Sequence, residues 1–478
     1  MRDECERDGA MYMKEINNIC SVIISKCDSF KIAVKEGNVE LSYSQLCENA
    51  IRFSKQCEGP GKVVTLYLDN SIEYVIAYFG ALLAGKEVLL IHPMYPVEEA
   101  AKLAQYVDTK IVITRKKELT EFGYEVNLPE ITFDECHEPA DLIDRSDECA
   151  LIVPTSGTTG IPKMIALTHE NIMTNVRDIR TSYGELRSGD VGLLILPLTS
   201  IFCNTAEMLV PFDKEMKVVI YNKAFNMNAI IRSIQEEKVN YCQMIPSILR
   251  VFCMFYKPDK VKLECFRRIT IGGEAITAEE IRTLSEQIYP IRILQGYGMT
   301  EASPVIASQR YLNKHNKYGS VGECMSSLQV RIQKDDDAKE GAIMIKGPSV
   351  SKSTYQGESL LNEDGWLDTG DIGYFDEDGF LYVCGRKKNI IIVGGINVYP
   401  EEVEGVLKGY EGVAEAVVYG ENDPDRGESV KAKIVVRSEV DILKLKKYCA
   451  QILPLAKVPG EISIVDTIEK TLTSKVRR

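Results

Sequence analysis

Residues 155–163 combine the chemical groups that binding a polyphosphate requires. They read Thr-Ser-Gly-Thr-Thr-Gly-Ile-Pro-Lys and follow a short apolar run at 150–153. Glycines let backbone N–H groups approach an anion, hydroxyl side chains add donors, and the lysine adds a positive charge. The spacing is not that of a Walker A loop, and an ordinary Ser/Thr/Gly turn is the competing interpretation. The candidate phosphate-binding residues are Thr155, Ser156, Gly157, Thr158, Thr159, Gly160 and Lys163.

A second polar segment, residues 295–301, reads Gln-Gly-Tyr-Gly-Met-Thr-Glu. Gly296 and Gly298 let the backbone approach a flat ligand, to which Tyr297 offers an aromatic face. Thr300 and Glu301 add a hydroxyl and a carboxylate. Mg²⁺ prefers oxygen ligands of the carboxylate type. The segment therefore favours a planar ligand beside a cation, with a simple Gly-Tyr-Gly turn as the alternative.

A third segment, residues 366–371, ends in Asp371 and is followed by Arg386. The two acceptor oxygens of a carboxylate suit the two hydroxyls of a vicinal diol. A surface Asp–Arg pair, which would add little stability, is the alternative. Near the chain end, Lys475 lies in Thr-Leu-Thr-Ser-Lys-Val-Arg-Arg, residues 471–478. Seen alone, such a basic end could simply keep the tail in water.

In this order, the segments resemble the motifs of the adenylate-forming acyl-CoA synthetase superfamily, which includes peptide-synthetase adenylation domains and beetle luciferases. The resemblance extends from Ser42 to Lys475. It implies ATP, Mg²⁺ and a small-molecule carboxylic acid, which react to acyl-adenylate and pyrophosphate. The acyl group then passes to the thiol of coenzyme A, or to the phosphopantetheine of an acyl or peptidyl carrier protein.

The resemblance also implies roles for single residues in binding the nucleotide. The loop at 155–163 would hold the β- and γ-phosphates, and Tyr297 would stack on adenine. Thr300 would contact the α-phosphate, and Glu301 would bind Mg²⁺. Asp371 and Arg386 would contact the ribose. By the same resemblance, the adenine and acyl pocket is lined by Gly272, Gly273 and Glu274.

The C-terminal motifs imply a moving domain. Lys475 matches the catalytic lysine of adenylation, and its ammonium can stabilise charge on the α-phosphate and the attacking carboxylate. Lys388 matches a hinge between two domains, and residues 394–402 match a loop lining the pantetheine tunnel. In this C-terminal part the sequence departs from the family pattern at Asn389 (usually aspartate), Glu469 (usually proline) and Ser474 (usually glycine).

The acyl pocket is expected around the segment that follows Leu196-Pro197. Ser200 stands where relatives often carry histidine. Cys203 stands where amino-acid-activating relatives carry aspartate, which disfavours an α-amino acid substrate. These walls are apolar or small and fit an acyl or aryl acid, although each could be plain core. The candidate pocket residues are Ser200, Phe202, Asn204, Ser247, Gly298 and Val305.

Apolar periodicity predicts the elements that position these residues. Strands are expected at 63–68, 88–91 and 111–113, with a helix at 71–83 between the first two. Alternating strands and helices of this kind form parallel sheets. Ser42 and Gln45 have the spacing of a capping box at a helix start. Later, a helix is expected at 401–407, strands at 414–419 and 432–436, and a helix at 441–453.

These elements predict an α/β fold. A large N-terminal domain, residues 1–386, would contain two βα sheet subdomains and a β-barrel-like unit at about 318–386, where Asp-Gly turns favour hairpins. A small mobile α+β C-terminal lid domain, residues 387–478, would follow, with its hinge at Lys388.

The composition narrows the class of protein. The 478 residues carry a net charge of −13, which disfavours broad binding to nucleic acid or anionic membranes. The 14 cysteines include no C-x-x-C pair, and no stretch is long and apolar enough for a membrane span, so a cytoplasmic protein with reduced thiols is expected. Three hypotheses remain: an acid–CoA ligase, a ligase that loads a carrier protein, and a catalytically weak acyl-nucleotide-binding relative.

Overall fold

The computed structural model describes residues 17–59, 61–155, 162–312, 317–334, 338–423 and 426–469. The first of its sheets has six strands in the order β6-β5-β3-β4-β7-β8, parallel except for the β7–β8 hairpin. Its strands are β3 (Val63–Leu66), β4 (Glu87–Leu90), β5 (Ile111–Ile113), β6 (Glu125–Asn127), β7 (Cys149–Thr155) and β8 (Lys163–Thr168). Its neighbouring helices are α2 (Tyr43–Gln56), α3 (Ile72–Leu83) and α4 (Val97–Tyr106), with the 3₁₀ turn η1 (Lys117–Phe122).

The second sheet has nine strands in the order β15-β14-β13-β12-β11-β9-β10-β1-β2. The strands from β13 to β1 are parallel, and the pairings at both edges are antiparallel. The strands are β1 (Ile32–Glu36), β2 (Val39–Ser42), β9 (Val191–Leu194), β10 (Lys217–Ile220), β11 (Tyr241–Met244), β12 (Arg268–Ile271), β13 (Arg292–Gly298), β14 (Val305–Ser308) and β15 (Glu323–Cys324).

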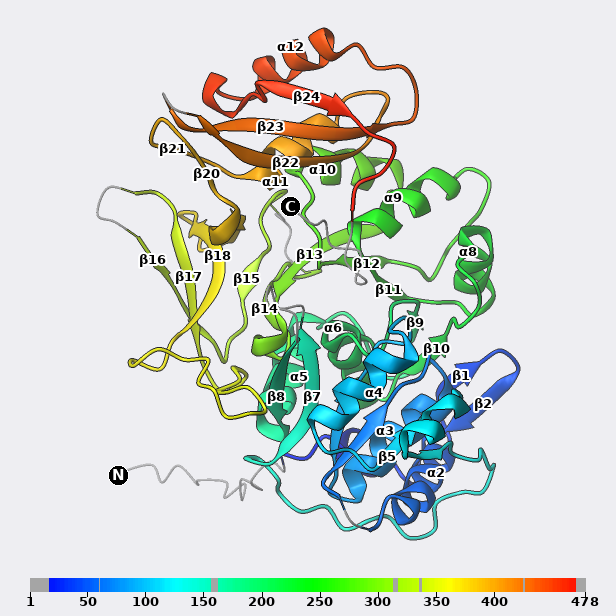
Figure 1. Cartoon of the computed structure of the whole chain (residues 1–478). Helices are drawn as coiled ribbons and strands as arrows, with labels where there is room; N and C mark the ends of the chain where they lie inside the picture. The colour runs from blue at the N-terminus through cyan, green and yellow to red at the C-terminus, as the bar shows by residue number, and fades with distance from the viewer. Residues whose placement is uncertain are drawn as a thin grey trace, which may run out of the picture.

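Helices cover both faces of this second sheet (Figure 1). One face packs against α8 (Met227–Glu236), α9 (Pro246–Phe255) and α10 (Ala278–Gln287). The opposite face shares its core with the first sheet and with α1 (Ser21–Ile24), α5 (His169–Ser182), α6 (Ile201–Cys203), the π-helix η2 (Asn204–Leu209) and α7 (Val210–Asp213). The expected α/β class with two βα sheet subdomains is confirmed.

The β-rich unit is an open antiparallel sheet rather than a barrel. Its order is β16-β17-β18-β19, and in the described part of the chain no pairing joins β19 back to β16. Four strands are too few to enclose a filled interior. The expected barrel-like closure is therefore corrected to a sheet of β16 (Gln329–Gln333), β17 (Gly341–Lys346), β18 (Leu367–Phe375) and β19 (Leu381–Arg386).

A separate C-terminal domain follows the short 3₁₀ turn η4 (Lys387–Asn389) and has its own apolar core. Its sheet runs β21-β20-β23-β22, with β24 beside β23. In Figure 1 this domain lies over α9, α10 and β18. Its elements are β20 (Ile391–Val393), β21 (Ile396–Val398), α11 (Pro400–Lys408), β22 (Val413–Asp423), β23 (Gly427–Val436), α12 (Ile442–Ile452), η5 (Leu455–Lys457) and β24 (Glu461–Ile464).

The described residues were also compared with the sequence-based expectations on membrane spans and cysteines. None of their helices has the length and apolar character needed to cross a membrane. All thirteen cysteines among them are free thiols, and most are buried.

The capping box predicted at Ser42 is confirmed at the start of α2. The Gln45 backbone N–H donates to Ser42 Oγ at 3.1 Å, and the Ser42 N–H donates to Gln45 Oε1 at 3.0 Å. Replacing Ser42 by alanine should lower the free energy of unfolding by about 1 kcal/mol, because an orphan helix donor loses its acceptor. Chemical denaturation of Ser42→Ala against Ser25→Ala would measure this. Equal stability of the two variants would contradict the prediction.

Candidate functional site

The candidate nucleotide site lies where adjacent parallel strands β12 and β13 end. Ligands bind at the carboxyl ends of such strands because the backbone groups there are free. A Cβ on Gly272 would stand 3.3 Å from the Gly296 carbonyl oxygen, and one on Gly298 would overlap the Pro304 carbonyl. Gly273 has φ +83°. The two predicted Gly-rich segments, 272–274 and 295–301, therefore lie side by side. Glycine is needed at these positions because a larger side chain would meet the neighbouring backbone.

Asp371 is the centre of a three-residue cluster at this site. The Tyr297 hydroxyl donates to Asp371 Oδ2 at 2.6 Å, and Arg386 Nε lies 2.9 Å from Asp371 Oδ1. Asp371 in β18 and Arg386 in β19 are register partners. The Asp371 side chain is only 6% exposed. Burial and the nearby carboxylate raise the pKa of Tyr297, so the phenol stays a hydrogen-bond donor.

The Asp371 cluster has the chemistry of a diol acceptor. A carboxylate has two acceptor oxygens with about four lone-pair directions. The Asp371 backbone N–H donates to Thr369 Oγ1 at 3.1 Å, and Thr369 Oγ1 donates to the Ile343 carbonyl at 2.9 Å. These bonds fix the direction of the strand at Asp371. The Asp371 carboxylate is therefore a hydrogen-bond acceptor whose backbone is held in place, next to the Tyr297 ring.

The predicted phosphate loop connects strands β7 and β8. Thr155 ends β7, Lys163 begins β8, and the two are register partners. Thr155 Oγ1 donates to the Lys163 carbonyl at 3.3 Å. The rest of the predicted loop lies outside the described residues, namely Ser156, Gly157, Thr158, Thr159 and Gly160.

Ser351 ties the Thr300–Glu301 segment to this hairpin. Its backbone N–H donates to the Glu301 carbonyl at 2.7 Å, and its hydroxyl donates to the Ala166 carbonyl in β8 at 2.7 Å. Thr300 and Glu301 form the half-buried 3₁₀ turn η3 (Thr300–Ala302). The structure thus brings the predicted α-phosphate and Mg²⁺ residues beside the hairpin that carries Lys163.

Glu301 fits the chemistry of a Mg²⁺ ion that also binds phosphate. Among the residues that the structure describes, no three His, Cys, Asp or Glu side chains form a metal-binding group. Mg²⁺ is commonly held by one or two carboxylates together with substrate phosphates and water. A single carboxylate beside the hairpin that is predicted to bind phosphate suits that mode.

Glu274 and Ser247 contact each other. The Ser247 N–H and Oγ both donate to the Glu274 carboxylate at 3.0 Å. Ser247 is in the first turn of α9, where a negative charge is favoured by the helix dipole. Glu274 thus fixes α9 against the Gly-rich turn.

The C-terminal candidates are described only in part. Lys388 is exposed in the turn η4, and Asn389 Nδ2 donates to Glu401 Oε1 at 3.3 Å. Gly394 and Gly395 form the exposed turn of the β20–β21 hairpin with positive φ. Lys475 lies outside the described residues.

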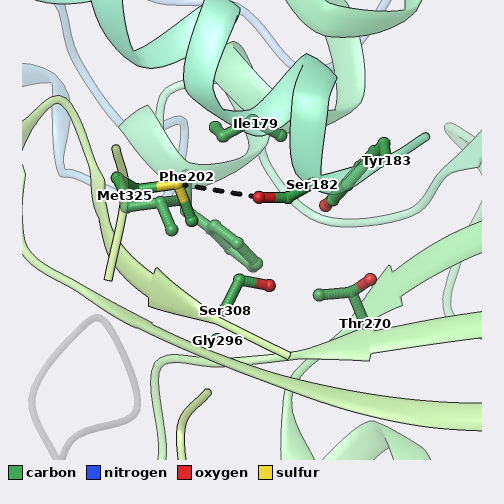
Figure 2. A pocket seen from close by; sticks show the side chains of 9 residues that line it. Ile179, Ser182, Tyr183, Phe202, Thr270, Gly296, Ser308 and Met325 are labelled. Atoms are coloured by element: carbon green, nitrogen blue, oxygen red, sulfur yellow. Dashed lines mark hydrogen bonds between the residues drawn. The ribbon is translucent and has the colours of Figure 1, made fainter. Parts of the chain in front are cut away.

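A small cavity borders Gly296, a residue of β13 (Figure 2). Of the six candidate pocket residues, Phe202 and Val305 line it, whereas Ser200, Ser247 and Gly298 do not. Asn204 is also not a wall. It is fully buried, accepts from the Tyr78 hydroxyl at 3.0 Å and donates to the Leu198 carbonyl at 3.4 Å. The helical turn after Phe202 thus directs the Asn204 side chain into the core, and its place in the acyl pocket stays a prediction. The cavity is lined by Ile179, Ser182, Tyr183, Phe202, Thr270, Gly296, Val305, Ser308 and Met325.

The motif analysis missed the polar residues of this cavity, Ser182, Tyr183, Thr270 and Ser308. Behind them, Gln243 and Arg268 are completely buried in β11 and β12. Buried parallel strands are normally continuous apolar runs, so a glutamine and an arginine in two such strands were a usable signal.

Known proteins match almost the whole chain. The family model for AMP-binding enzymes covers residues 26–355, and that for the AMP-binding enzyme C-terminal domain covers 402–475. The 2-succinylbenzoate–CoA ligase of Bacillus licheniformis is 29% identical, over 94% of this chain and 96% of the relative. The long-chain-fatty-acid–CoA ligase of Bacillus subtilis is 28% identical, over 94% and 90%.

A solved structure agrees with these matches. The o-succinylbenzoate CoA synthetase of Bacillus subtilis, in complex with its acyl-adenylate intermediate, has a TM-score of 0.85 and 26% identity over 97% of both chains. The same enzyme in complex with ATP and magnesium ion has a TM-score of 0.83 over 96% of this chain and 98% of that one. The chain belongs to the AMP-binding enzyme family, within the adenylate-forming acyl-CoA synthetase superfamily that its motifs resemble.

Proposed function

We propose that the Tyr297–Asp371–Arg386 cluster, the β7–β8 hairpin and the Thr300–Glu301 turn form the active centre of this AMP-forming acid–CoA ligase. The observation that carries the proposal is the convergence of polar segments far apart in the sequence around the ends of β12 and β13. Each segment supplies the group that one part of a nucleotide needs. The diol, the planar base and the phosphates each have a suitable partner.

The reaction has two steps. In the first, a carboxylate oxygen of the acid attacks the α-phosphorus of ATP, and the bond from that phosphorus to the pyrophosphate oxygen breaks. In the second, the thiolate of coenzyme A attacks the acyl carbon, and AMP leaves with the electron pair. When bound, Mg²⁺ neutralises phosphate charge. Asp371 would orient the ribose, Thr300 would donate to the α-phosphate, and Lys163 would stabilise the leaving pyrophosphate.

We further propose that the C-terminal domain turns about Lys388 between the two steps. Lys475 would serve adenylation, and the 394–402 loop would serve thioester formation. The exposed Lys388 turn, placed between β19 and β20, supports this because exposed turns at the ends of elements absorb backbone rotation. The cytoplasmic location and the 386/387 domain boundary remain predictions.

Isotope exchange tests the function directly. Purified protein with Mg·ATP should move labelled pyrophosphate into ATP only when an acceptable carboxylic acid is present. With coenzyme A added, the same acid should give a thioester and AMP. A holo-carrier protein supplied instead of coenzyme A tests the alternative acceptor. A protein that does not bind ATP would refute the proposal.

A further inference from the structure

Helix α11 of the C-terminal domain makes close contacts with the large domain. Its N-cap is the buried Tyr399, whose hydroxyl donates to Glu340 Oε1 at 2.6 Å. Glu340 directly precedes β17 of the β-rich sheet, and Cys384 Sγ donates to its other oxygen at 3.2 Å. In β19, a Cβ on Gly385 would stand 3.1 Å from the Tyr399 ring. The start of α11 is therefore bonded to and packed against the large domain.

Gly405 brings the middle of α11 against the start of α10. A Cβ at this position would stand 2.3 Å from Thr277 Cγ2, which is well inside the contact distance of two carbon atoms. Thr277 is the N-cap of α10, and its Oγ1 accepts from the Glu280 backbone N–H at 3.2 Å. Glycine inside a helix is less favourable than alanine. The contact with α10 gives this glycine a structural reason, because alanine would push the two helices apart.

The last turn of α11 packs less closely. A cavity of about 230 Å³ separates Lys408 and Arg437 of the C-terminal domain from Arg250 and Glu280 of the large domain. Arg250 pairs with Glu280 at 2.5 Å, inside its own domain. Among the described residues, neither Lys408 nor Arg437 forms an ion pair across the cavity. The contacts that fix the helix are therefore those of its first two turns.

Two observations relate this domain arrangement to the first step of the proposed reaction. Gly394 and Gly395, at the tip of the 394–402 loop, are exposed, and a Cβ on either would meet nothing within 4 Å. In Figure 1 their β20–β21 hairpin points away from β12 and β13, whereas the chain after β24 runs from the C-terminal domain toward the large domain. Lys475 follows that segment in the sequence. The arrangement thus suits the role proposed for Lys475 and not that of the loop.

We propose that α11, through Gly405 on Thr277 and Tyr399 on Glu340, holds the C-terminal domain in the arrangement that serves acyl-adenylate formation. Gly405 and Tyr399 are positioning residues, because they act through the place of the domain that carries Lys475. The inference rests on the proposed domain rotation and assigns the contacts that stabilise one of its two arrangements. Weakening these contacts shifts the population toward the other arrangement.

Gly405→Ala tests the helix contact. The added methyl group would overlap Thr277 Cγ2, although alanine favours the helix itself and should preserve the midpoint of thermal unfolding. Pyrophosphate release in a single turnover should slow by about 10–100-fold, the scale of an overpacked contact. Thioester formation from supplied acyl-adenylate should be at least as fast as in the wild type. Gly460→Ala is the matched control, because a Cβ there meets only the Val430 carbonyl oxygen at 3.8 Å.

A second substitution, Thr277→Ser in the Gly405→Ala background, tests whether the two residues act through their contact. Serine keeps the hydroxyl that caps α10 but lacks the Cγ2 methyl group. The double variant therefore moves one methyl group from α10 to α11 and should regain most of the lost rate of pyrophosphate release. A folded double variant without this recovery, or equal losses in both half-reactions of Gly405→Ala, would overturn the inference.

Tyr399→Phe measures the hydrogen bond independently of the helix contact. Loss of the hydroxyl that donates to Glu340 should slow pyrophosphate release by about tenfold, the scale of one hydrogen bond to a charged group, and should spare thioester formation. Tyr410→Phe is the matched control. Its ring packs on Tyr448 within the C-terminal domain, and its hydroxyl has no hydrogen bond among the described residues.

Failure of this inference can be distinguished from failure of the proposed function. If the wild-type protein exchanges no pyrophosphate with any carboxylic acid, both are refuted. If the wild type exchanges pyrophosphate while Gly405→Ala and Tyr399→Phe behave like their controls, the proposed function stands and the role assigned to α11 is refuted.

Discussion

Lys475→Ala is expected to slow acyl-adenylate formation by about 10²–10³-fold, the usual scale for one lost electrostatic contact in a transition state. Negative charge develops between the attacking carboxylate and the α-phosphate, whereas Lys163, another cation of the motifs, belongs to the hairpin proposed for the outer phosphates. Transfer from preformed acyl-adenylate to coenzyme A should be spared, because the domain would then present the 394–402 loop instead.

The measurement compares the two half-reactions in single turnovers. Acyl-adenylate formation is followed by pyrophosphate release, and transfer is followed by thioester formation from supplied acyl-adenylate. Arg477→Ala is the matched control, since it removes a positive charge two residues away from Lys475. Equal losses in both half-reactions would argue against a domain that changes position between them.

Most of the fold could be predicted because its elements have strong local signals. The expected helix at 71–83 is α3 (Ile72–Leu83), with Ser71 as the N-cap, and the expected strand at 63–68 is β3 (Val63–Leu66). Apolar periodicity fixes such elements through burial on one or both faces. Strand pairing was harder to predict. The expected barrel-like unit was wrong because turn sequences indicate which neighbouring strands form hairpins, but not whether the two outermost strands of the sheet pair with each other.

The site was predictable only where several residues in a row carry the signal. The motif segments predict Tyr297 and Asp371 in one site, but the direct hydrogen bond between them depends on the tertiary arrangement of β13 and β18, which no local pattern contains. Asn204 was proposed as a pocket wall from its place after Leu196-Pro197, and no local pattern shows that its amide pairs with Tyr78 inside the core. Tyr183 and Thr270 were missed because single hydroxyl residues in helices and strands have no distinctive spacing.

Asp371→Ala is expected to lower kcat/KM for ATP by roughly 10²-fold, mostly through a higher KM. A hydrogen bond to a charged group contributes about 1.5–3 kcal/mol, and this carboxylate would accept from both ribose hydroxyls. The substitution also leaves the Tyr297 hydroxyl and the Arg386 guanidinium without their shared partner. The loss should therefore appear in ATP binding while the acyl pocket is unchanged.

Two further variants make the Asp371 result specific. Asp371→Asn keeps one acceptor oxygen without the charge and should fall between the wild type and Asp371→Ala. Asp364→Ala removes an exposed aspartate from the turn before β18 and should leave KM for ATP unchanged. Direct titration with ATP measures affinity in each variant, and the midpoint of thermal unfolding checks the fold. Asp371 joins β18 to β13 through its hydrogen bond with Tyr297. Wild-type affinity for ATP in a folded Asp371→Ala protein would therefore place the ribose elsewhere and remove the central contact of the proposed site.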